Sequence, residues 1–264
     1  MKEKIGIVGV GYVGGAVQHW FEKLYRRPVK LFLYDRYKEI GSFQEVSDHA
    51  QTVFVCVPTP YRERGGGYDG SAIDETLRSL KKPKVVVIKS TVLPGSTERF
   101  QKKFPRHKIL FNPEFLVAKT ANDDFVNPHR QIVGYTRKSQ LAADQVLKLL
   151  PRAPFTRVMP ATEAETVKYF GNAFLALKVI FANQMYDLCE RLGIDYDLVR
   201  EAAGADPRIG QSHMEIFHDG YRGYGGACLP KDTKALIDLA KKLKAPLKLL
   251  EMADAVNGVL RRSK

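Results

Sequence analysis

The sequence predicts an α/β protein in which a doubly wound parallel sheet is followed by a smaller all-helical domain with one long helix. In the first half of the 264 residues, apolar runs rich in β-branched residues alternate with amphipathic helical patterns, as in successive βαβ units. A glycine-rich turn at residues 9–14 joins the first strand to the first helix, and the second half is helical in pattern almost throughout. We therefore expect a Rossmann-type domain at residues 1–160 and a helical domain at residues 161–264.

Strands and helices are expected to alternate along the first domain. Apolar runs predict strands at residues 4–8, 29–34, 52–57, 85–90, 108–111 and 130–134. Helical periodicity predicts helices at residues 12–24, 72–80, 95–104 and 139–150. The helices between successive strands make each connection long enough to join parallel strands. We therefore expect the helices to cover both faces of a mainly parallel sheet. The proline-bearing stretch 151–160 marks the change to the second domain.

The second domain should begin with a long helix. Thr162 and Glu165 have the spacing of a capping box, and apolar residues then recur at steps of three and four as far as Gly193. Other apolar residues lie off this stripe, so the helix should be covered on more than one side, by its own domain or by another subunit. We expect a homodimer through this helix. Further helices are predicted at residues 196–203, 233–243 and 247–260.

Composition narrows the class of protein. Apolar residues make up 44% of the chain and charged residues 27%, which is typical of a globular protein rather than a disordered one. No apolar run approaches the roughly 20 residues of a membrane span, and no signal-peptide core follows Met1, so we expect a cytoplasmic protein without membrane association. The net charge of +13 favours anionic partners, but the basic residues are dispersed in short pairs, so nucleic acid is a remote alternative. The 3 cysteines, without a C-x-x-C pair, predict neither a disulfide framework nor a metal site.

A cofactor site is predicted at the first glycine-rich turn. The G-x-G-x-x-G pattern consists of Gly9, Gly11 and Gly14, with Tyr12 and Val13 inside it. Glycines there let the backbone approach a pyrophosphate, which the helix N-terminus also attracts. Asp35 ends the second strand, where a carboxylate binds a ribose 2′-hydroxyl and repels a 2′-phosphate. We therefore expect NAD, although Arg36 and Lys38 leave NADP open, and a purely structural glycine turn is the other alternative.

The segment 223–232 contains the second informative pattern. Its glycines allow a substrate to lie against the backbone, and Cys228 follows just before the Pro-Lys-Asp start of a helix. A thiol at a helix N-terminus beside Lys231 favours the thiolate and so makes a usable nucleophile. A small buried hydrophobe is the alternative, and the environment alone leaves both open. Cys56 and Cys189 are expected to be buried packing residues.

A series of motifs in chain order carries a resemblance to a known family. They are the turn at 9–14; Val-Cys-Val-Pro-Thr-Pro at 55–60; Ser-Thr-Val and Pro-Gly at 90–95; Asn-Pro-Glu-Phe-Leu at 112–116; Lys168 with Asn172; Arg-Ile-Gly at 208–210; and Gly-Tyr-Gly-Gly-Ala-Cys-Leu-Pro-Lys-Asp at 223–232. Together they resemble the UDP-glucose/GDP-mannose dehydrogenase family. The resemblance implies that two molecules of NAD oxidise the primary alcohol of a nucleotide-sugar, UDP-glucose being the expected one, to a carboxylate through a cysteine thiohemiacetal and thioester.

The resemblance also implies roles for individual residues. In catalysis, Cys228 would be the nucleophile, Lys168 and Asn172 would stabilise the oxyanion, Asp232 would hold a water for proton transfer, Thr91 would orient water, and Glu114 would activate it for thioester hydrolysis. Substrate would contact Glu114, Phe115, Leu116, Lys168, Asn172, Tyr224 and Gly225, with Arg208 reaching the sugar-phosphate across the dimer interface. Thr59, Ser90, Thr91 and Lys231 would join the glycine turn and Asp35 at the cofactor. Apart from the resemblance, Asp232 could serve only as a helix N-cap, and Arg208 could only pair with a carboxylate.

Departures from the family pattern bear on function. Ala118 stands where the family has a second glutamate shortly after Asn-Pro-Glu-Phe-Leu. The family also continues into another Rossmann-like domain, so we expect a naturally short enzyme, a fragment, or one half of a split protein whose partner chain supplies that domain. Other functions stay open: a two-electron β-hydroxyacid dehydrogenase, which needs no nucleophilic thiol, and a non-catalytic NAD- or nucleotide-binding module.

Overall fold

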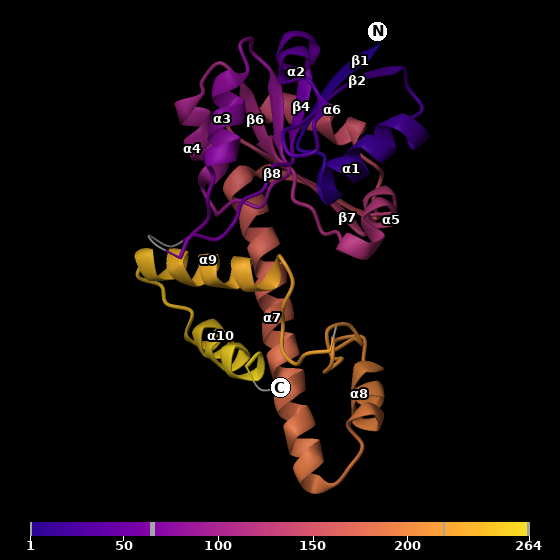
Figure 1. Ribbon diagram of the computed structural model, residues 1–264, viewed down its shortest axis with the longest axis vertical. Helices are drawn as coiled ribbons and strands as arrows, with labels where there is room; N and C mark the ends of the chain where they lie inside the picture. The colour runs from indigo at the N-terminus through magenta and orange to yellow at the C-terminus, as the bar shows by residue number, and fades with distance from the viewer. Residues whose placement is uncertain (1, 64–66, 219, 263–264) are drawn as a thin grey trace. The chain divides into compact units, whose positions relative to one another are not determined.

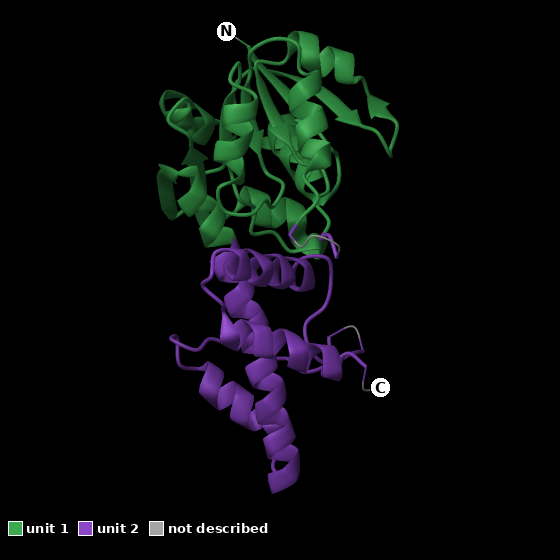
Figure 2. Ribbon diagram, turned by 90° about the vertical axis from the view of Figure 1, so that its left-hand side faces the viewer, with its two compact units in different colours: residues 1–60, 68–168 green, residues 61–67, 169–264 purple. Residues whose placement is uncertain are grey.

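The computed structural model describes residues 2–63, 67–218 and 220–262, and the chain divides into two compact units. Unit 1 comprises residues 1–60 and 68–168, and unit 2 comprises residues 61–67 and 169–264 (Figure 2). The division falls inside the helix α7 (Ala161–Leu192), whose first turns belong to unit 1. In the part of the chain that is described, no helix has both the length and the apolar character needed to cross a membrane.

Unit 1 is built on an 8-stranded sheet with the strand order β3-β2-β1-β4-β5-β6-β7-β8. The strands are β1 (Glu3–Val8), β2 (Val29–Asp35), β3 (Ile40–Gly41), β4 (Thr52–Val55), β5 (Val85–Ile88), β6 (Lys108–Phe111), β7 (Arg130–Tyr135) and β8 (Phe155–Pro160). The central strands are parallel neighbours, whereas β3 and β7 run antiparallel to β2 and β6. Strand order reverses between β1 and β4, and ligands bind at such a switch point, outside the carboxyl ends of the strands.

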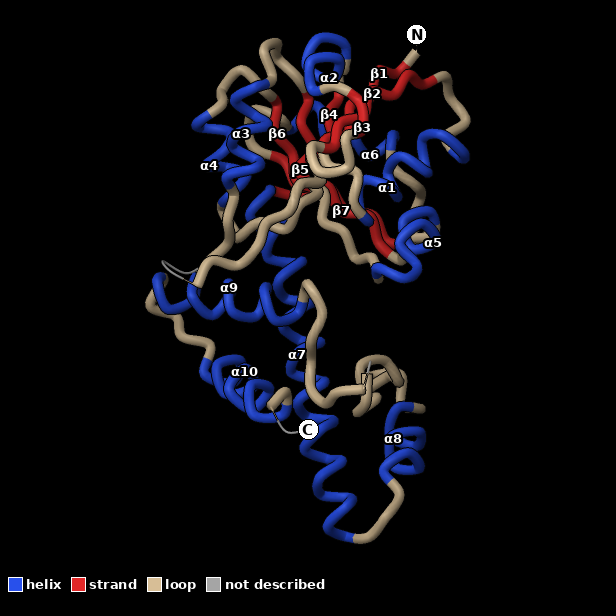
Figure 3. Tube along the Cα trace, in the orientation of Figure 1, coloured by secondary structure: helices blue, strands red, loops and turns tan. Residues whose placement is uncertain are grey.

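Helices cover both faces of this sheet (Figures 1 and 3). One face carries α2 (Phe43–His49), α3 (Ser71–Ser79) and α4 (Ser96–Lys103), and the other carries α1 (Tyr12–His19), α5 (Ala121–Val126) and α6 (Gln140–Leu149). A π-helical turn at Trp20–Leu24 extends α1, and a 3₁₀ turn at Ala118–Thr120 precedes α5. Along β4, the side chains of Val53 and Val55 enter one core and that of Phe54 enters the other. Burial on both faces explains why these strands are continuously apolar.

The strands predicted from apolar runs are confirmed, but β8 lies where the sequence pattern predicts only a connection. β8 pairs in parallel with β7 at the edge of the sheet, most of its residues are exposed, and it ends at Pro160. An edge strand of this kind lacks the apolar run that identifies a central strand. The short elements β3, α2 and α5 are likewise absent from the sequence prediction.

The capping box predicted for the long helix is wrong. The helix α7 begins at Ala161, so Thr162 lies inside it. Glu165 is fully buried and accepts hydrogen bonds from the backbone N–H groups of Gly95 (2.6 Å) and Thr97 (2.7 Å), and from the Thr97 hydroxyl (2.6 Å). Glu165 therefore caps α4 rather than its own helix, and it ties the first turns of α7 to the loop that follows β5.

Unit 2 packs shorter helices along α7. They are α8 (Tyr196–Gly204), α9 (Leu229–Lys242) and α10 (Lys248–Leu260). Ile180 of α7 is buried with Ala253 of α10, and Cys189 of α7 is buried with Tyr196 of α8. Part of the apolar stripe predicted for α7 is exposed instead: Phe170, Phe174, Phe181 and Leu188 expose 49–71% of their surface. Leu177 and Met185 of the same stripe are partly buried against other helices of unit 2.

Candidate active site

The glycine turn follows β1 at the switch point of the sheet in unit 1. Gly9 has a φ of +88°, and a Cβ on Gly14 would lie 1.8 Å from the Gly9 carbonyl oxygen, so glycine is required at both positions. Among the residues that the structure describes, a Cβ on Gly11 would meet no atom within 4 Å beyond its chain neighbours and the backbone of its own helix. Tyr12 is exposed and Val13 is half-buried. The backbone at the start of α1 is therefore open to an anionic ligand.

Asp35, the last residue of β2, is held by backbone donors. Its Oδ2 accepts a hydrogen bond from the N–H of Val10 (2.7 Å), and its Oδ1 accepts from Tyr37 (2.9 Å) and Lys38 (3.0 Å). Burial acts to raise the pKa of Asp35, but these hydrogen bonds and the Lys38 charge bring it below its ordinary value. Asp35 is thus a carboxylate of fixed orientation beside the glycine turn.

A cavity of about 460 Å³ adjoins this carboxylate. Its lining includes Gly9, Asp35, Arg36, Val57, Pro58, Asp69 and Glu75. Arg36 is paired with Glu75, and Lys38 Nζ donates to the Val10 carbonyl (2.6 Å). Both cations that could accommodate a 2′-phosphate are therefore already engaged within the chain.

The loops that follow β4 and β5 are joined at the carboxyl edge of the sheet. Thr59 Oγ1 donates to the Thr91 carbonyl (2.8 Å), and Ser90 Oγ donates to the Val57 carbonyl (2.6 Å). These hydroxyls connect the two loops, and the Thr91 side chain is half-buried beside them. The structure thus brings the predicted cofactor residues of unit 1 to one edge of the sheet.

Glu114 and Lys168 form a buried ion pair within unit 1. Lys168 Nζ lies 3.0 Å from Glu114 Oε1 and donates to the Glu114 carbonyl oxygen (2.7 Å). The other carboxylate oxygen accepts from the N–H of Leu116 (2.9 Å). Burial acts to raise the pKa of Glu114, but Lys168 and the Leu116 amide hold it below its ordinary value. Glu114 is therefore ionised at neutral pH.

Lys89 is a second buried cation, which the sequence motifs do not single out. Its Nζ donates to Asn112 Oδ1 (2.6 Å) and lies 5.1 Å from the centroid of the Phe125 ring. Burial lowers the pKa of Lys89 to about 8, and burial also raises the pKa of the Cys56 thiol to about 12. The available signal for Lys89 was a lysine closing an apolar strand directly before Ser90.

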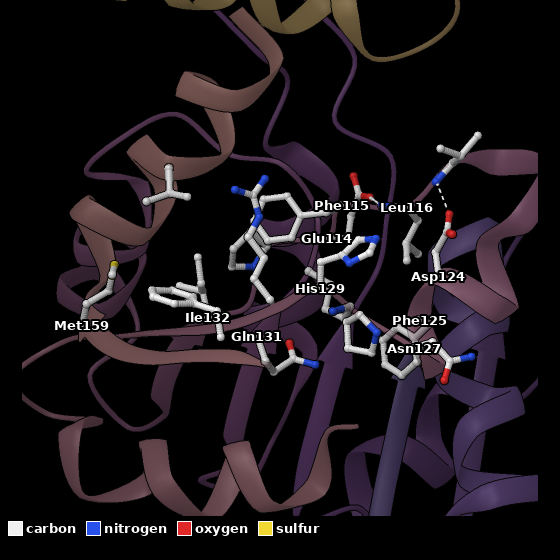
Figure 4. A pocket seen from close by; sticks show the side chains of 17 residues that line it. Glu114, Phe115, Leu116, Asp124, Phe125, Asn127, His129, Gln131, Ile132 and Met159 are labelled. Carbon is white, nitrogen blue, oxygen red and sulfur yellow. Dashed lines mark hydrogen bonds between the residues drawn. The ribbon is translucent and has the colours of Figure 1, made fainter. Parts of the chain in front are cut away.

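A cavity of about 780 Å³ opens beside Glu114 (Figure 4). The Phe115 ring forms part of its wall and stacks against the Arg130 guanidinium, 3.8 Å from the ring centroid. Further lining residues shown in Figure 4 are Leu116, Asp124, Phe125, Asn127, His129, Gln131, Ile132 and Met159. A mainly apolar lining with a few polar groups is typical of small-molecule sites. No motif identified Arg130 or His129 in the sequence.

Ala118 lies beside the glycine turn. It lines a cavity of about 420 Å³ together with Gly11, Tyr12 and Gly15. Lys119 and Asp123 line the same cavity. The departure from the family pattern at position 118 therefore changes the wall next to the cofactor turn.

In unit 2, Cys228 is exposed at the N-cap of α9. Asp232 is buried in the first turn of that helix, so its interpretation as an N-cap is wrong: α9 begins at Leu229. Asp232 Oδ2 accepts a hydrogen bond from Asn172 Nδ2 (2.6 Å), and Asp232 Oδ1 lies 2.5 Å from Lys231 Nζ. A thiol, a carboxylate, an amide and an ammonium group thus occupy neighbouring positions within unit 2.

The remaining predicted substrate residues of unit 2 differ in environment. The Tyr224 side chain is buried, its hydroxyl donates to Asp254 (2.9 Å), and its backbone N–H and carbonyl are hydrogen-bonded to Asn257. Gly225 is half-buried. Burial and the Asp254 charge raise the pKa of Tyr224, which keeps the hydroxyl a donor. The Arg208 side chain is 88% exposed and pairs with Asp206 (2.5 Å). Among the described residues of unit 2, the partner of the Arg208 guanidinium is therefore Asp206 and none of the predicted site residues.

Two family models match the chain. The "UDP-glucose/GDP-mannose dehydrogenase family, NAD binding domain" matches residues 21–150, and the "UDP-glucose/GDP-mannose dehydrogenase family, central domain" matches residues 162–258. The NAD-binding match and the carboxylate at the end of β2 agree on NAD as the cofactor.

Individual relatives extend this result. The chain is 38% identical over 239 residues to UDP-glucose 6-dehydrogenase of Pseudomonas aeruginosa, covering 83% of this chain and 51% of the relative. It is 33% identical over 226 residues to UDP-glucose 6-dehydrogenase of Rickettsia prowazekii, covering 82% and 51%. A solved UDP-glucose dehydrogenase from Pyrobaculum islandicum superposes with a TM-score of 0.82 at 28% identity, covering 98% of this chain and 68% of that chain. The chain spans about half the length of these curated relatives.

Proposed function

Because the chain belongs to the UDP-glucose/GDP-mannose dehydrogenase family, we propose that it is an NAD-dependent nucleotide-sugar 6-dehydrogenase, or the catalytic portion of one, acting on UDP-glucose. The observation that carries the proposal lies in unit 2. Cys228 is exposed at the start of α9, and Asp232 in the first turn of that helix accepts a hydrogen bond from Asn172 of α7. A thiol without such neighbours would favour the packing interpretation.

The proposed cofactor site fits NAD. The open space over Gly11 admits a pyrophosphate to the backbone, and Asp35 presents a fixed acceptor for a ribose hydroxyl. When bound, NAD accepts a hydride in each of the two oxidations. Arg36 and Lys38 are engaged elsewhere, which supports NAD over NADP.

In the first oxidation, C6 of the sugar loses a hydride and its hydroxyl loses a proton, giving an aldehyde. Asp232 holds the water that receives this proton. The Cys228 thiolate then adds to the aldehyde carbon, and the carbonyl oxygen becomes an alkoxide. Lys168 and Asn172, one turn apart on α7, stabilise the negative charge on that oxygen.

In the second oxidation, C6 of the thiohemiacetal loses another hydride and becomes a thioester. Glu114, an ionised carboxylate, takes a proton from the attacking water, and Thr91 orients that water. Cleavage of the carbon–sulfur bond releases the uronic acid and restores the Cys228 thiolate. For this sequence to occur, residues of the two units must act on one substrate.

We also propose a division of roles along the chain. Residues 1–160 bind NAD, with Thr59 and Ser90 as contributors, and residues 161–264 carry the dimer interface and add Lys231 to the cofactor site. The exposed apolar stripe of α7 supports a homodimer, because a second copy would bury it. Arg208, exposed in one chain, would reach the substrate of its partner. A separate chain that carries the part of the relatives not spanned here is the other proposed partner.

A coupled assay tests the function. The full chain is mixed with NAD and a panel of nucleotide-sugars, and both reduced NAD and uronic acid are quantified. We expect UDP-glucose to give two NADH per uronic acid. One NADH per product with a β-hydroxyacid, unaffected by Cys228→Ser, would favour the hydroxyacid dehydrogenase instead. NAD binding without NADH from any substrate would favour a non-catalytic module.

A further inference from the structure

The helix α10 contacts the glycine-rich segment 221–225 through one face. Asp254 and Asn257 of this helix, and Arg261 at its C-cap, all meet this segment. Asn257 Oδ1 accepts from the backbone N–H of Tyr224 (2.8 Å), and Asn257 Nδ2 donates to the carbonyl of the same residue (3.1 Å). The amide side chain thus pairs with both backbone polar groups of one residue, as a neighbouring β-strand would.

Side chains on both sides reinforce this pairing. The Tyr224 hydroxyl donates to Asp254 (2.9 Å), and the Arg261 guanidinium lies 3.5 Å from the centroid of the Tyr221 ring. Tyr224 and Asn257 are 2% and 7% exposed, so water cannot readily replace the two backbone hydrogen bonds. Loss of the Asn257 amide would leave a buried N–H and a buried carbonyl unpaired.

The glycines of the segment are required by this contact. Gly223 has a φ of +78°, and a Cβ on it would lie 2.4 Å from Asn257 Oδ1. A Cβ on Gly225 would lie 2.6 Å from the Tyr221 hydroxyl. Both glycines therefore allow close packing inside unit 2. At Gly226, by contrast, an added Cβ would meet no atom of the described residues within 4 Å beyond its chain neighbours.

We propose that Asn257 and Asp254 are positioning residues, which fix the backbone of residues 223–225 and thereby the approach to Cys228. The proposal rests on the proposed function, because it assigns this segment to substrate binding. Neither residue touches the reacting atoms. They act through the Tyr224 backbone and hydroxyl, so α10 adds a determinant of the loop conformation to the one that the glycines themselves supply.

Graded variants of the full chain test this inference. Asn257→Ala removes both backbone hydrogen bonds, and Asp254→Ala removes only the acceptor of the Tyr224 hydroxyl. Met252→Ala is the matched control, because Met252 is on the same helix and is 65% exposed. Hydrogen–deuterium exchange of residues 221–228 is measured by mass spectrometry, and dissociation constants for UDP-glucose and for NAD are measured by calorimetry.

We expect exchange in residues 221–228 to accelerate about tenfold in Asn257→Ala, about threefold in Asp254→Ala and not at all in Met252→Ala. UDP-glucose affinity should fall at least about tenfold in Asn257→Ala while NAD affinity stays within about twofold. Unchanged exchange in Asn257→Ala would overturn the proposal, as would a parallel loss of both affinities. If Asn257→Ala does not fold, Asp254→Ala tests the proposal through the same exchange and affinity measurements. Unchanged exchange in Asp254→Ala would then overturn it.

The two proposals fail in different ways. If the unaltered chain binds no nucleotide-sugar, the proposed function fails, while the exchange series still shows whether α10 holds the segment. If the unaltered chain binds UDP-glucose and the variants bind it equally well, the function stands and the positioning role is refuted.

Discussion

Breaking the Glu114–Lys168 pair should destabilise unit 1 substantially. The charged atoms are 3.0 Å apart, and the two side chains are only 10% and 5% exposed. At that distance and an effective dielectric constant of about 20, their attraction is about 5–6 kcal/mol, and loss of one partner of a buried pair costs about 3–5 kcal/mol. Glu114→Gln keeps an acceptor for the Leu116 N–H, so we expect a loss near the lower end, about 3 kcal/mol.

The measurement can be confined to unit 1. The chain has 1 tryptophan, Trp20, which lies in unit 1 and donates through Nε1 to the Leu149 carbonyl (2.8 Å), so its fluorescence reports unfolding of that unit in urea. Glu114→Gln, Lys168→Met and the double variant form a cycle whose coupling energy should be at least about 1.5 kcal/mol. Additivity within about 0.5 kcal/mol would refute the reasoning.

A surface pair provides the control for this cycle. Arg78 pairs with Asp74 on α3 at 2.7 Å, but the Arg78 side chain is 67% exposed. Arg78→Met should therefore cost less than about 1 kcal/mol.

The pH dependence of the free energy of unfolding gives a second check on the Glu114–Lys168 pair. The pKa of Glu114 is lowered in the folded state, so its contribution is complete above its ordinary value of 4.5 and is lost as the pH falls through the folded-state value.

Four other outcomes are expected. Cys228→Ser should lower the rate of NADH formation with UDP-glucose about 1000-fold or more while leaving NAD binding intact; an unchanged rate in the same assay would remove the thiol from the mechanism. Asp35→Ala should weaken NAD about tenfold in calorimetry through loss of a charge-assisted hydrogen bond, and unchanged affinity would contradict the ribose assignment. Phe174→Glu or Phe181→Glu should raise the dimer dissociation constant at least about 100-fold in sedimentation equilibrium, because each buries a charge in an apolar interface; a stable dimer in both variants would place the interface elsewhere. Burial raises the pKa of Glu165 to about 7 from an ordinary value of 4.5, so between these pH values the folded state binds more protons than the unfolded state, and the free energy of unfolding should fall as the pH rises. Glu165→Gln should abolish this pH dependence of the free energy of unfolding, measured in urea titrations. If the pH dependence persists in the variant, another group titrates.

Most strands of unit 1 are predictable because the environment of each strand determines its own run of residues. A strand buried on both faces must be continuously apolar, which is why β4 and β5 can be read directly from the chain. The strand β8 cannot be recognised in this way, since it is a largely exposed edge strand that pairs with β7. The exposed stripe of α7 shows the same limit: periodicity identifies an apolar face but not which element covers it.

Some residues of the candidate site can be predicted from the sequence and others cannot, for similar reasons. Gly9 is required by its own φ of +88°, and Gly14 is required because a Cβ there would meet the Gly9 carbonyl oxygen, so the local sequence pattern reveals both positions. The capping prediction for Glu165 is wrong because its carboxylate accepts hydrogen bonds from Gly95 and Thr97, which are distant in the chain. Lys89 and Arg130 were missed for the same reason, since their importance depends on rings and amides contributed by other loops.

The Asp35 carboxylate connects two parts of the proposed cofactor site, the glycine turn and the end of β2. Asp35 Oδ2 holds the amide of Val10, which is part of the glycine turn, while the carboxylate itself terminates β2. Engineering the coenzyme preference by changing position 35 alone would therefore also loosen the glycine turn. A successful redesign would have to supply a replacement acceptor for the Val10 N–H together with the new ribose contact.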